Sequence, residues 1–297
     1  MIQRNFQHAA GPHDISSRKP AWYFLRRQLP LAGFITLFLA SSFTSFIVPT
    51  RAHAAIVTTL PPLAGLVRML DVEADVRCLL APGADAHEFQ LSPRQVQALK
   101  QAELLVRSSY DDGHWSGLSL PGRTFDLWPK TAHAWLSPQA VRQQLPRLAK
   151  ALQQIAPQRQ QDIADNLTQA LKQCDAIDNA LKNALAPYRK SGVIMQHNAW
   201  AKVLKAYAVP IWSVLESQHH GANIRPRRLE AALAQLAKHP KAVLWGNRQH
   251  ANRGLIWLNK HSAQNGQTRH LLLLEPLGNC SMNWRQLMQN NLQQISP

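Results

Sequence analysis

Short apolar runs alternate with amphipathic segments along the chain from residue 55 onward. The runs AAIVTTL, VRCLL and AELLVRS are separated by segments in which apolar residues recur at helical spacing. Apolar runs of four to eight residues bounded by turn residues predict buried strands, whereas the 3.6-residue period predicts helices. This alternation indicates an α/β domain with a mainly parallel sheet.

Two of the predicted helices carry the same start signal. Ser92-Pro93 and Ser137-Pro138 each combine an N-cap residue with proline at the first helical position. A histidine stands a few residues before each of them, His87 in the first case and His133 in the second. Both histidines are therefore expected in short, stiff segments that lead into a helix, where a loop exposes the side chain to a ligand.

The second half of the chain repeats the architecture of the first. Residues 108–132 are rich in Gly, Ser, Pro and Asp and are predicted to be a loop. Residues 158–186 predict one helix of roughly 40 Å at 1.5 Å per residue, and a second strand–helix alternation begins at Gly192. We therefore predict two α/β lobes with mainly parallel sheets, residues 55–150 and 191–297, joined by a long bridging α-helix within residues 151–190.

Residues 1–54 have the features of an export signal. Arg26 and Arg27 precede the run LPLAGFITLFLASSFTSFIV, and Ala52-His53-Ala54 has the small-x-small pattern of a signal-peptidase site. The sequence thus predicts a signal peptide cleaved after Ala54 and a protein located in the periplasm. The alternative is an uncleaved membrane anchor, because the apolar run is nearly long enough to span a bilayer.

Charge does not point to a nucleic-acid partner. The chain has 33 Lys and Arg against 17 Asp and Glu, and without residues 1–54 the counts are 27 and 16. A basic balance can indicate binding to nucleic acid or to an anionic membrane. Here the basic residues are scattered, the densest group is RPRR at 225–228, and no nucleic-acid motif accompanies them. We expect a solvated basic surface, no nucleic-acid binding and a monomer.

The three cysteines are Cys78, Cys174 and Cys280. An odd number in an exported chain leaves at least one cysteine without an intramolecular partner, and no Cys-x-x-Cys motif is present. We expect buried thiols or at most one disulfide. Because no cysteine stands at the predicted cleavage point, we expect a soluble protein rather than a lipoprotein.

Four polar residues stand near the ends of apolar strand runs. His87 and His133 belong to the first predicted lobe, His197 and Glu275 to the second. Residues at the carboxyl ends of parallel strands face the cleft where α/β proteins bind ligands. Three imidazoles and one carboxylate form a suitable zinc set. Taken singly, a histidine near an apolar strand is more often a hydrogen-bonded structural residue than a ligand, and Glu275 could simply be exposed at the mouth of its strand.

The chain resembles the periplasmic receptors of metal ABC importers, the class that binds zinc or manganese. The matching segments are GADAHEFQLSPRQVQALKQAELLV, HAWLSPQAVRQ, the long helix, VIMQHNAW and LEPLG, which appear in the order typical of that family. The resemblance implies two lobes with one metal in the cleft, a membrane permease as partner, and the metal ligands His87, His133, His197 and Glu275. Zinc receptors resemble this chain in having histidine at the third position, where manganese receptors typically have glutamate.

The chain also departs from the family pattern. Glu275 stands where aspartate is common, WGNRQH at 245–250 stands where an acidic-Pro pair is usual, and only Cys280 corresponds to the usual C-terminal disulfide. The region before the second ligand is short, with Asp111, Asp112 and His114 in place of a long His- and acid-rich loop.

These observations favour a high-affinity zinc receptor that is not an enzyme. The first alternative is a receptor for manganese or another divalent ion. The second is a zinc hydrolase, although four protein ligands would close the coordination position that a catalytic zinc keeps open, and no HExxH motif is present. The third is a metal buffer or adhesin without transport function. His219 and His220 could form an auxiliary metal site or a simple surface pair.

Overall fold

The computed structural model describes residues 55–86, 88–216, 224–249, 251–264, 266 and 269–296. These residues fall within one compact unit, residues 51–297. The predicted signal peptide and its cleavage site, His87, and the pair His219 and His220 lie outside the described residues. Within the described part of the chain, no helix has both the length and the apolar character needed to span a membrane.

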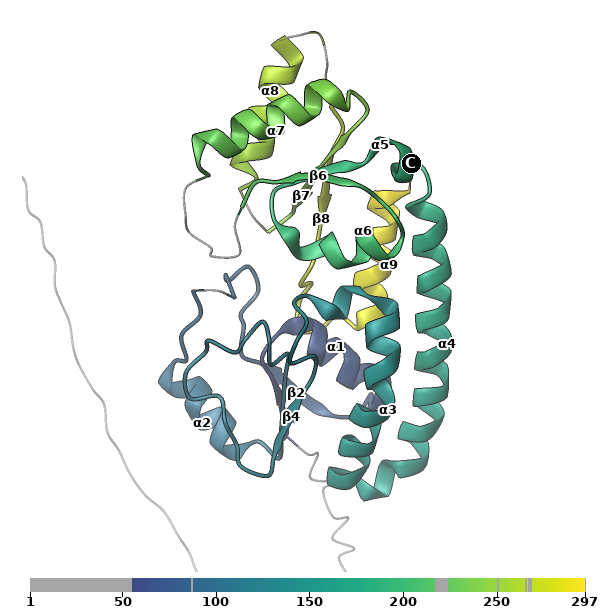
Figure 1. Cartoon of the computed structure of the whole chain (residues 1–297). Coiled ribbons are helices and arrows are strands. Elements are labelled where there is room, and N and C mark those ends of the chain that lie inside the picture. Colours follow the sequence, from purple (N-terminus) through teal and green to yellow (C-terminus); the bar gives the residue numbers. More distant parts are fainter. Residues whose placement is uncertain are drawn as a thin grey trace, which may run out of the picture. The chain divides into compact units, whose positions relative to one another are not determined.

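The first lobe is a four-stranded parallel sheet with the strand order β2-β1-β3-β4 (Figure 1). Its strands and first helices follow the predicted alternation, except that residues 124–126 of the predicted loop form an edge strand. This strand has only three residues, none of them buried, so it lacks an apolar run. The elements are β1 (Ala55–Thr58), α1 (Pro61–Leu70), β2 (Asp75–Cys78), α2 (Pro93–Gln101), β3 (Leu104–Arg107) and β4 (Thr124–Asp126).

The second lobe repeats this plan with the strand order β6-β5-β7-β8, again parallel throughout. All four of its strands correspond to apolar runs in the sequence. The elements are α5 (Tyr188–Ser191), β5 (Val193–Met195), η3 (Asn198–Trp200), α6 (Ala201–Ala206), β6 (Ile211–Val214), α7 (Pro226–Lys238), β7 (Val243–Asn247), α8 (Arg253–Gln264), β8 (Leu271–Leu274) and α9 (Trp284–Ile295). The prediction of two parallel-sheet lobes is thus confirmed.

Three helical elements connect the lobes: α3 (Pro138–Ile155), η2 (Pro157–Arg159) and α4 (Gln160–Ala184), with η1 (Ala134–Leu136) just before them. Figure 1 shows α4 extending alongside both lobes. At its start, buried Arg159 donates to Asp71 of the first lobe over 2.7 Å. Nearer its end, Asp178 accepts a 2.6 Å hydrogen bond from the hydroxyl of Tyr207 in the second lobe. A 25-residue helix held at both ends is the predicted bridge.

The helix starts follow the predicted capping. The Ser92 hydroxyl accepts a hydrogen bond from the Gln95 N–H at the start of α2, and the Ser137 hydroxyl accepts one from the Ala140 N–H at the start of α3. Both helices have proline at the first position. The local sequence therefore fixes where the segments containing residue 87 and His133 end.

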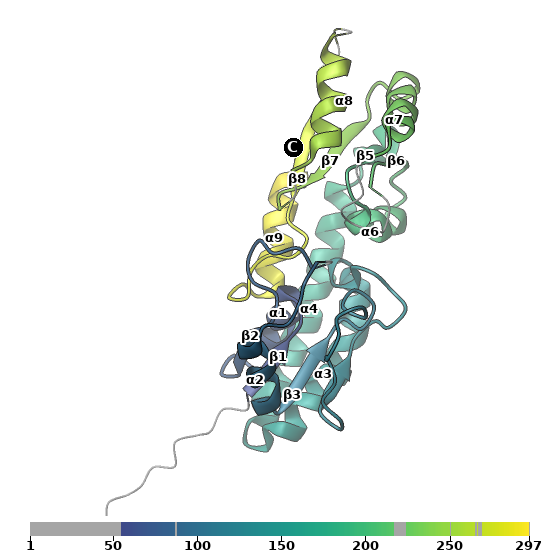
Figure 2. The ribbon, with the colours of Figure 1, turned by 90° about the vertical axis from the view of Figure 1, so that its left-hand side faces the viewer.

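The connection from β8 to α9 returns the chain from the second lobe to the first (Figure 2). Helix α9 packs against α1 and α4 as well as β8. Gly65 of α1 permits this contact, because a Cβ there would lie 2.7 Å from the backbone nitrogen of Trp284. The ring nitrogen of Trp135 donates to the Pro276 carbonyl over 2.7 Å, and that of Trp284 donates to the Trp135 carbonyl over 2.6 Å. These contacts pack Trp135 of the first lobe against the segment from β8 to α9.

A disulfide joins the same two regions. Cys78 at the end of β2 is bonded to Cys280 in the β8–α9 connection, at a sequence separation of 202. The expectation of at most one disulfide is confirmed, and the partner of Cys280 is a residue of the first lobe. Closing a loop this long stabilises the fold by about 5 kcal/mol in the chain-entropy account. Cys174 is a buried free thiol whose pKa is raised by burial to about 12.

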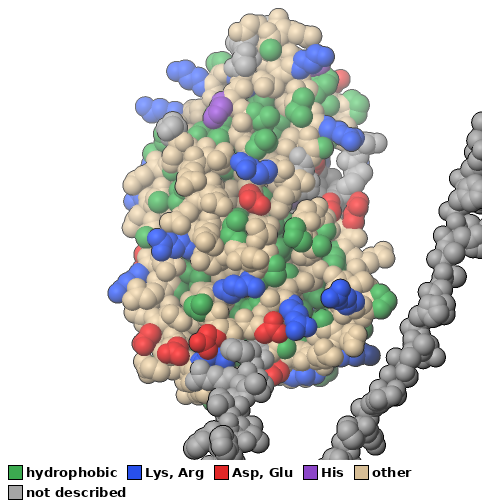
Figure 3. All heavy atoms as spheres, turned by 180° about the vertical axis from the view of Figure 1, so that it is seen from behind, with side chains coloured by type: hydrophobic (Ala, Val, Ile, Leu, Met, Phe, Trp, Pro, Cys, Tyr) green, Lys and Arg blue, Asp and Glu red, His purple; other side chains and the backbone are tan. Residues whose placement is uncertain are grey.

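The surface agrees with the scattered basic residues of the sequence. Figure 3 shows Lys and Arg side chains distributed over the face it presents, with Asp and Glu side chains among them. This face has no continuous basic strip of the kind that tracks a nucleic-acid backbone.

Candidate functional site

A cavity of about 90 Å³ lies between the two lobes. The first lobe contributes the loop before residue 87 together with Asp111 and His133, and the second lobe contributes residues at or just after the ends of β5, β7 and β8. Its lining residues are Leu60, Gly83, Ala84, Asp85, Ala86, Asp111, His133, Trp135, His197, Ala199, Asn247, Gln249, Pro276 and Leu277. The cavity therefore lies at the carboxyl ends of strands in both sheets, where the fold class is expected to bind ligands.

His133 is held by a carboxylate on the β3 side of the first lobe. It has a left-handed backbone conformation, with φ of 49° and ψ of 30°. Its N–H donates to both carboxylate oxygens of Asp111, over 3.0 and 3.2 Å, and its ring Nδ1 lies 3.9 Å from Asp111 Oδ1. The same carboxylate thus stabilises an unusual backbone conformation and faces one nitrogen of the ring.

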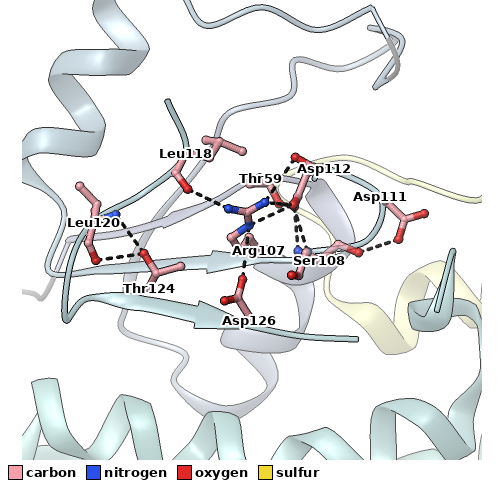
Figure 4. Close-up of polar contacts among 10 residues, drawn as sticks. Thr59, Arg107, Ser108, Asp111, Asp112, Leu118, Leu120, Thr124 and Asp126 are labelled. Atoms are coloured by element: carbon pink, nitrogen blue, oxygen red, sulfur yellow. Dashed lines mark hydrogen bonds and ion pairs between the residues drawn. The ribbon is translucent and has the colours of Figure 1, made fainter. Parts of the chain in front are cut away.

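Asp111 belongs to a dense network at the end of β3 (Figure 4). It accepts a 2.6 Å hydrogen bond from Ser108. Its neighbour Asp112 is fully buried and accepts bonds from the Thr59 hydroxyl, the N–H groups of residues 108 and 109, and the Arg107 guanidinium. Burial raises the pKa of the Asp111 carboxyl to about 6, although the bonds from Ser108 and the His133 N–H lower it.

His197 also lies beside a carboxylate, which belongs to the second lobe. It follows β5 and is 7% exposed, with its ring Nδ1 3.8 Å from Glu216 Oε2. Gln196 orients that glutamate, because its Nε2 donates to Glu216 Oε1 over 2.7 Å while its own Oε1 accepts from the Leu255 N–H over 3.1 Å. An amide relay thus positions the carboxylate that faces the ring.

The two histidines meet across the cavity through their other ring nitrogens. His133 Nε2 and His197 Nε2 are 3.4 Å apart, and the rings are inclined at 75°. A carboxylate beside each Nδ1 favours the tautomer with hydrogen on Nδ1 and a lone pair on Nε2. The 3.4 Å contact is a hydrogen bond when one ring carries its hydrogen on Nε2, and it is a pair of facing lone pairs that a cation would satisfy when both rings carry it on Nδ1. Ligands at tetrahedral positions about 2.0–2.1 Å from zinc lie roughly 3.3–3.4 Å apart, so the pair fits such an ion.

The loop before residue 87 is fixed on both sides of that position. The ring nitrogen of Trp115 donates to the Ala86 carbonyl over 2.7 Å, and the Phe89 ring packs on Trp115 with centroids 4.0 Å apart. Ala86 itself lines the cavity. The described residues, which omit His87, contain no group of three His, Cys, Asp or Glu side chains suited to a metal.

Glu275 lines a different cavity from the two histidines. Glu275 lines a second cavity, of about 160 Å³, with Arg248 and residues of α9, and it is not among the residues that line the first. Its backbone N–H donates to Asn291 Oδ1 and its carbonyl accepts from Asn291 Nδ2, both over 2.8 Å. The next two residues, Pro276 and Leu277, face the first cavity instead. The place of Glu275 in the ligand set therefore stays a prediction from the sequence.

Sequence reasoning missed three polar residues of the site. Glu216 was not considered, Asp111 was noted only as a remnant of an acidic loop, and Gln249 only as part of a departure from the family pattern. The available signal was position: Asp111, Glu216 and Gln249 each follow within four residues of a strand whose carboxyl end faces the cavity.

Comparisons with known proteins identify the family of the chain. Residues 56–297 match the family described as zinc-uptake complex component A, periplasmic. A putative metal-binding protein from Thermotoga maritima is 24% identical over 214 residues, which cover 64% of this chain and 77% of that protein.

Solved structures show the same fold. A crystal structure of ZnuA superposes with a TM-score of 0.69 at 19% identity, and the periplasmic zinc-binding protein TroA from Treponema pallidum with 0.71 at 14%. Each match covers 82% of this chain and 98% of the other. With the family match over residues 56–297, these findings show that the chain belongs to the family of periplasmic zinc-uptake components, the metal-binding receptors of ABC importers.

Proposed function

We propose that this receptor binds zinc in the cavity between its lobes, with His133 and His197 as ligands through Nε2 and His87 as the third ligand. The observation that carries the proposal is the 3.4 Å separation of the two Nε2 atoms, which equals the edge of a tetrahedral zinc site. The rigid loop at Ala86, next to His87 in sequence, lines the same cavity and supports the third assignment. Glu275 is left out of the ligand set.

The nature of the donors supports zinc over harder cations. Neutral imidazoles suit borderline ions such as zinc, whereas manganese favours carboxylate, carbonyl and water oxygens. The carboxylates of Asp111 and Glu216 face the Nδ1 side of the two rings, where they increase the basicity of the coordinating nitrogens. Since only neutral imidazole coordinates, acidification through the histidine range is expected to weaken binding.

Binding and release of the ion constitute the proposed activity. The protein is exported, cleaved after Ala54, and acts as a monomer that delivers zinc to the membrane permease of an ABC importer. The long helix α4, anchored to both lobes, favours small relative movements over wide hinge closure. Release at the permease would then require local opening of the cavity.

The test is a metal titration of the metal-stripped mature protein. Zinc and manganese are titrated separately in competition with a chelator, and tryptophan fluorescence is followed because the Trp135 ring lies edge-on to His133 at 5.5 Å. We expect one tight zinc site, weakened at least a hundredfold by His133→Ala or His197→Ala. Glu275→Gln is the matched control and should bind zinc as the wild type does. Zinc binding indifferent to both histidines, or a preference for manganese, contradicts the proposal.

A zinc hydrolase is the second candidate function, and it has its own test. Without Glu275, three histidines would leave a coordination position for water, as in catalytic zinc sites. The family consists of solute-binding receptors, so we expect the zinc-loaded protein to hydrolyse an activated ester no faster than its His197→Ala variant. Turnover that depends on both zinc and His197 would favour the hydrolase.

A further inference from the structure

The excess of basic residues belongs almost entirely to the second lobe. Residues 191–297 have 12 Lys and Arg against 3 Asp and Glu, whereas residues 55–150 have 10 against 9. In the first lobe, bases pair with acids, as Arg107 does with Asp112 and Asp126. The second lobe has too few acids for such pairing. Its surface is therefore expected to have a positive potential that attracts anionic partners.

Helices α7 and α8 form an outer layer of this lobe. The two helices pack against each other, and they also pack on β6 and β7 respectively. Figures 1 and 2 both show them at the end of the second lobe that is remote from the first. The described residues that line the cavity belong to neither helix, so this layer is separate from the proposed zinc site.

Each of these helices has one exposed stripe that begins and ends with a basic residue. Positions i, i+4, i+7 and i+11 of a helix share a face, and on α7 they hold four exposed residues: Arg227, Ala231, Ala234 and Lys238. On α8 the corresponding stripe is Arg253, Ile256 and Lys260, again all exposed. Within the described part of the chain, none of these four bases forms an ion pair. Their charges are therefore available to a partner.

The apolar residue on α8 favours a lipid surface as that partner. Ile256 is 54% exposed and stands between Arg253 and Lys260, which are about 10 Å apart along the helix. The next residue, Trp257, is half-buried and stacks on His261 with ring centroids 3.7 Å apart. An aliphatic side chain and a tryptophan beside Lys and Arg are typical of helices that lie on anionic membranes, where the bases meet lipid phosphates. Single bases spread over a surface also suit a bilayer, whose charge is spread evenly.

We infer that the α7–α8 face, defined by Arg227, Lys238, Arg253, Ile256 and Lys260, binds reversibly to an anionic lipid bilayer. The family is periplasmic, so a membrane surface lies within reach of the chain. The four bases interact with lipid phosphates, and Ile256 enters the headgroup region. The contact is weak, because each base contributes only about fivefold in affinity at such a surface. It goes beyond the proposed function, since it keeps the receptor near its permease without using the zinc ligands.

The test is sedimentation of the mature protein with vesicles of phosphatidylcholine, either pure or with about one third phosphatidylglycerol. We expect binding only to the anionic vesicles, weakened at least about tenfold when the salt concentration rises from about 0.05 M to about 0.5 M. A variant with Arg227→Gln, Lys238→Gln, Arg253→Gln and Lys260→Gln should lose at least about a hundredfold in affinity. The matched control removes four exposed bases of the first lobe and should lose less than about threefold: Arg94→Gln, Lys100→Gln, Lys130→Gln and Lys150→Gln.

Ile256→Ser separates lipid contact from charge alone. It should weaken binding to the anionic vesicles by about three- to tenfold, and it should leave retention on polyglutamate beads unchanged. Binding to both kinds of vesicle alike, an equal loss in the first-lobe control, or retention on polyglutamate without vesicle binding overturns the inference; the last result would indicate an acidic protein as partner. If the fourfold variant unfolds, Arg253→Gln with Lys260→Gln makes the same test on α8. Zinc titration of each variant should match the wild type, so failure of the zinc site is seen separately.

Discussion

The two lobes share one sheet plan but hold their histidines by different means. In the first lobe, His133 depends on a charged network in which Asp111 and the fully buried Asp112 are neighbours. In the second lobe, His197 is oriented through the uncharged amide of Gln196 and a partly exposed glutamate, Glu216, whose side chain is 23% exposed. We infer that the first half-site, His133 with its charged network, contributes to the stability of its lobe. The second half-site, His197 with Gln196 and Glu216, contributes little to the stability of the sheet that carries it.

This difference predicts where mutations act. Asp112 accepts hydrogen bonds from both β1 and β3 regions, so its loss should affect folding before it affects metal binding. The carboxylate of Glu216 accepts a hydrogen bond from Gln196 and faces the ring of His197. Its loss should therefore affect metal binding before it affects folding. Separate measurements of stability and zinc affinity can therefore test whether the two lobes differ in this way.

The largest effect is expected for Asp112→Asn. An amide nitrogen would face the N–H groups and the guanidinium that now donate to a carboxylate, which leaves Arg107 without its buried counter-charge. We expect the free energy of unfolding of the metal-free protein to fall by about 3–5 kcal/mol in urea titrations. Asp126→Asn is the control, because Asp126 contacts the same arginine from an exposed position and should change stability by less than about 0.5 kcal/mol.

A somewhat smaller effect, of opposite sign, is expected for Asp111→Asn. Burial raises the pKa of Asp111 from 3.8 to about 6, so ionisation opposes folding. The stability that this group contributes is fully present below pH 3.8 and is lost as the pH rises through about 6. The cost of the ionised form reaches about 3 kcal/mol at neutral pH. The metal-free variant should therefore unfold at a higher urea concentration than the wild type at pH 7.

The difference between the Asp111→Asn variant and the wild type should shrink to near zero at pH 4, where the wild-type carboxyl is neutral in the folded state. Asparagine retains an oxygen that can accept from the His133 N–H. A variant that is equally destabilised at pH 4 and pH 7 would show that the first half-site depends on the charge of Asp111 for its geometry.

The fold could be predicted because its signals are local. The apolar runs of β1, β3 and β5 and the capped starts of α2 and α3 fix element type and position within a few residues. Strand β4 escaped prediction because a three-residue edge strand with no buried position has no apolar pattern. The Cys78–Cys280 pairing escaped because the partners, 202 residues apart, meet only when α9 returns to the first lobe.

The site could be predicted only in part. His133 and His197 meet as expected from their places near strand ends, while the side chain of Glu275, at an equally suggestive place, lines a different cavity. Its backbone is bonded to Asn291 on α9, sixteen residues away, a contact that no strand pattern encodes. The carboxylates that face the rings come from other strand ends, so only the folded lobes reveal which acid serves which histidine.

The smallest effect on folding, and the clearest on affinity, is expected for Glu216→Gln. Glutamine keeps an oxygen for the Gln196 amide but removes the negative charge beside His197 Nδ1, so the ring becomes a weaker donor to the ion. Zinc affinity measured by chelator competition should fall by about 10- to 100-fold, with the urea midpoint of the metal-free protein unchanged. Glu230→Gln, an exposed acid on α7, controls for the change in net charge. A loss of stability comparable to that of Asp112→Asn would mean that the second half-site is as integral to its lobe as the first.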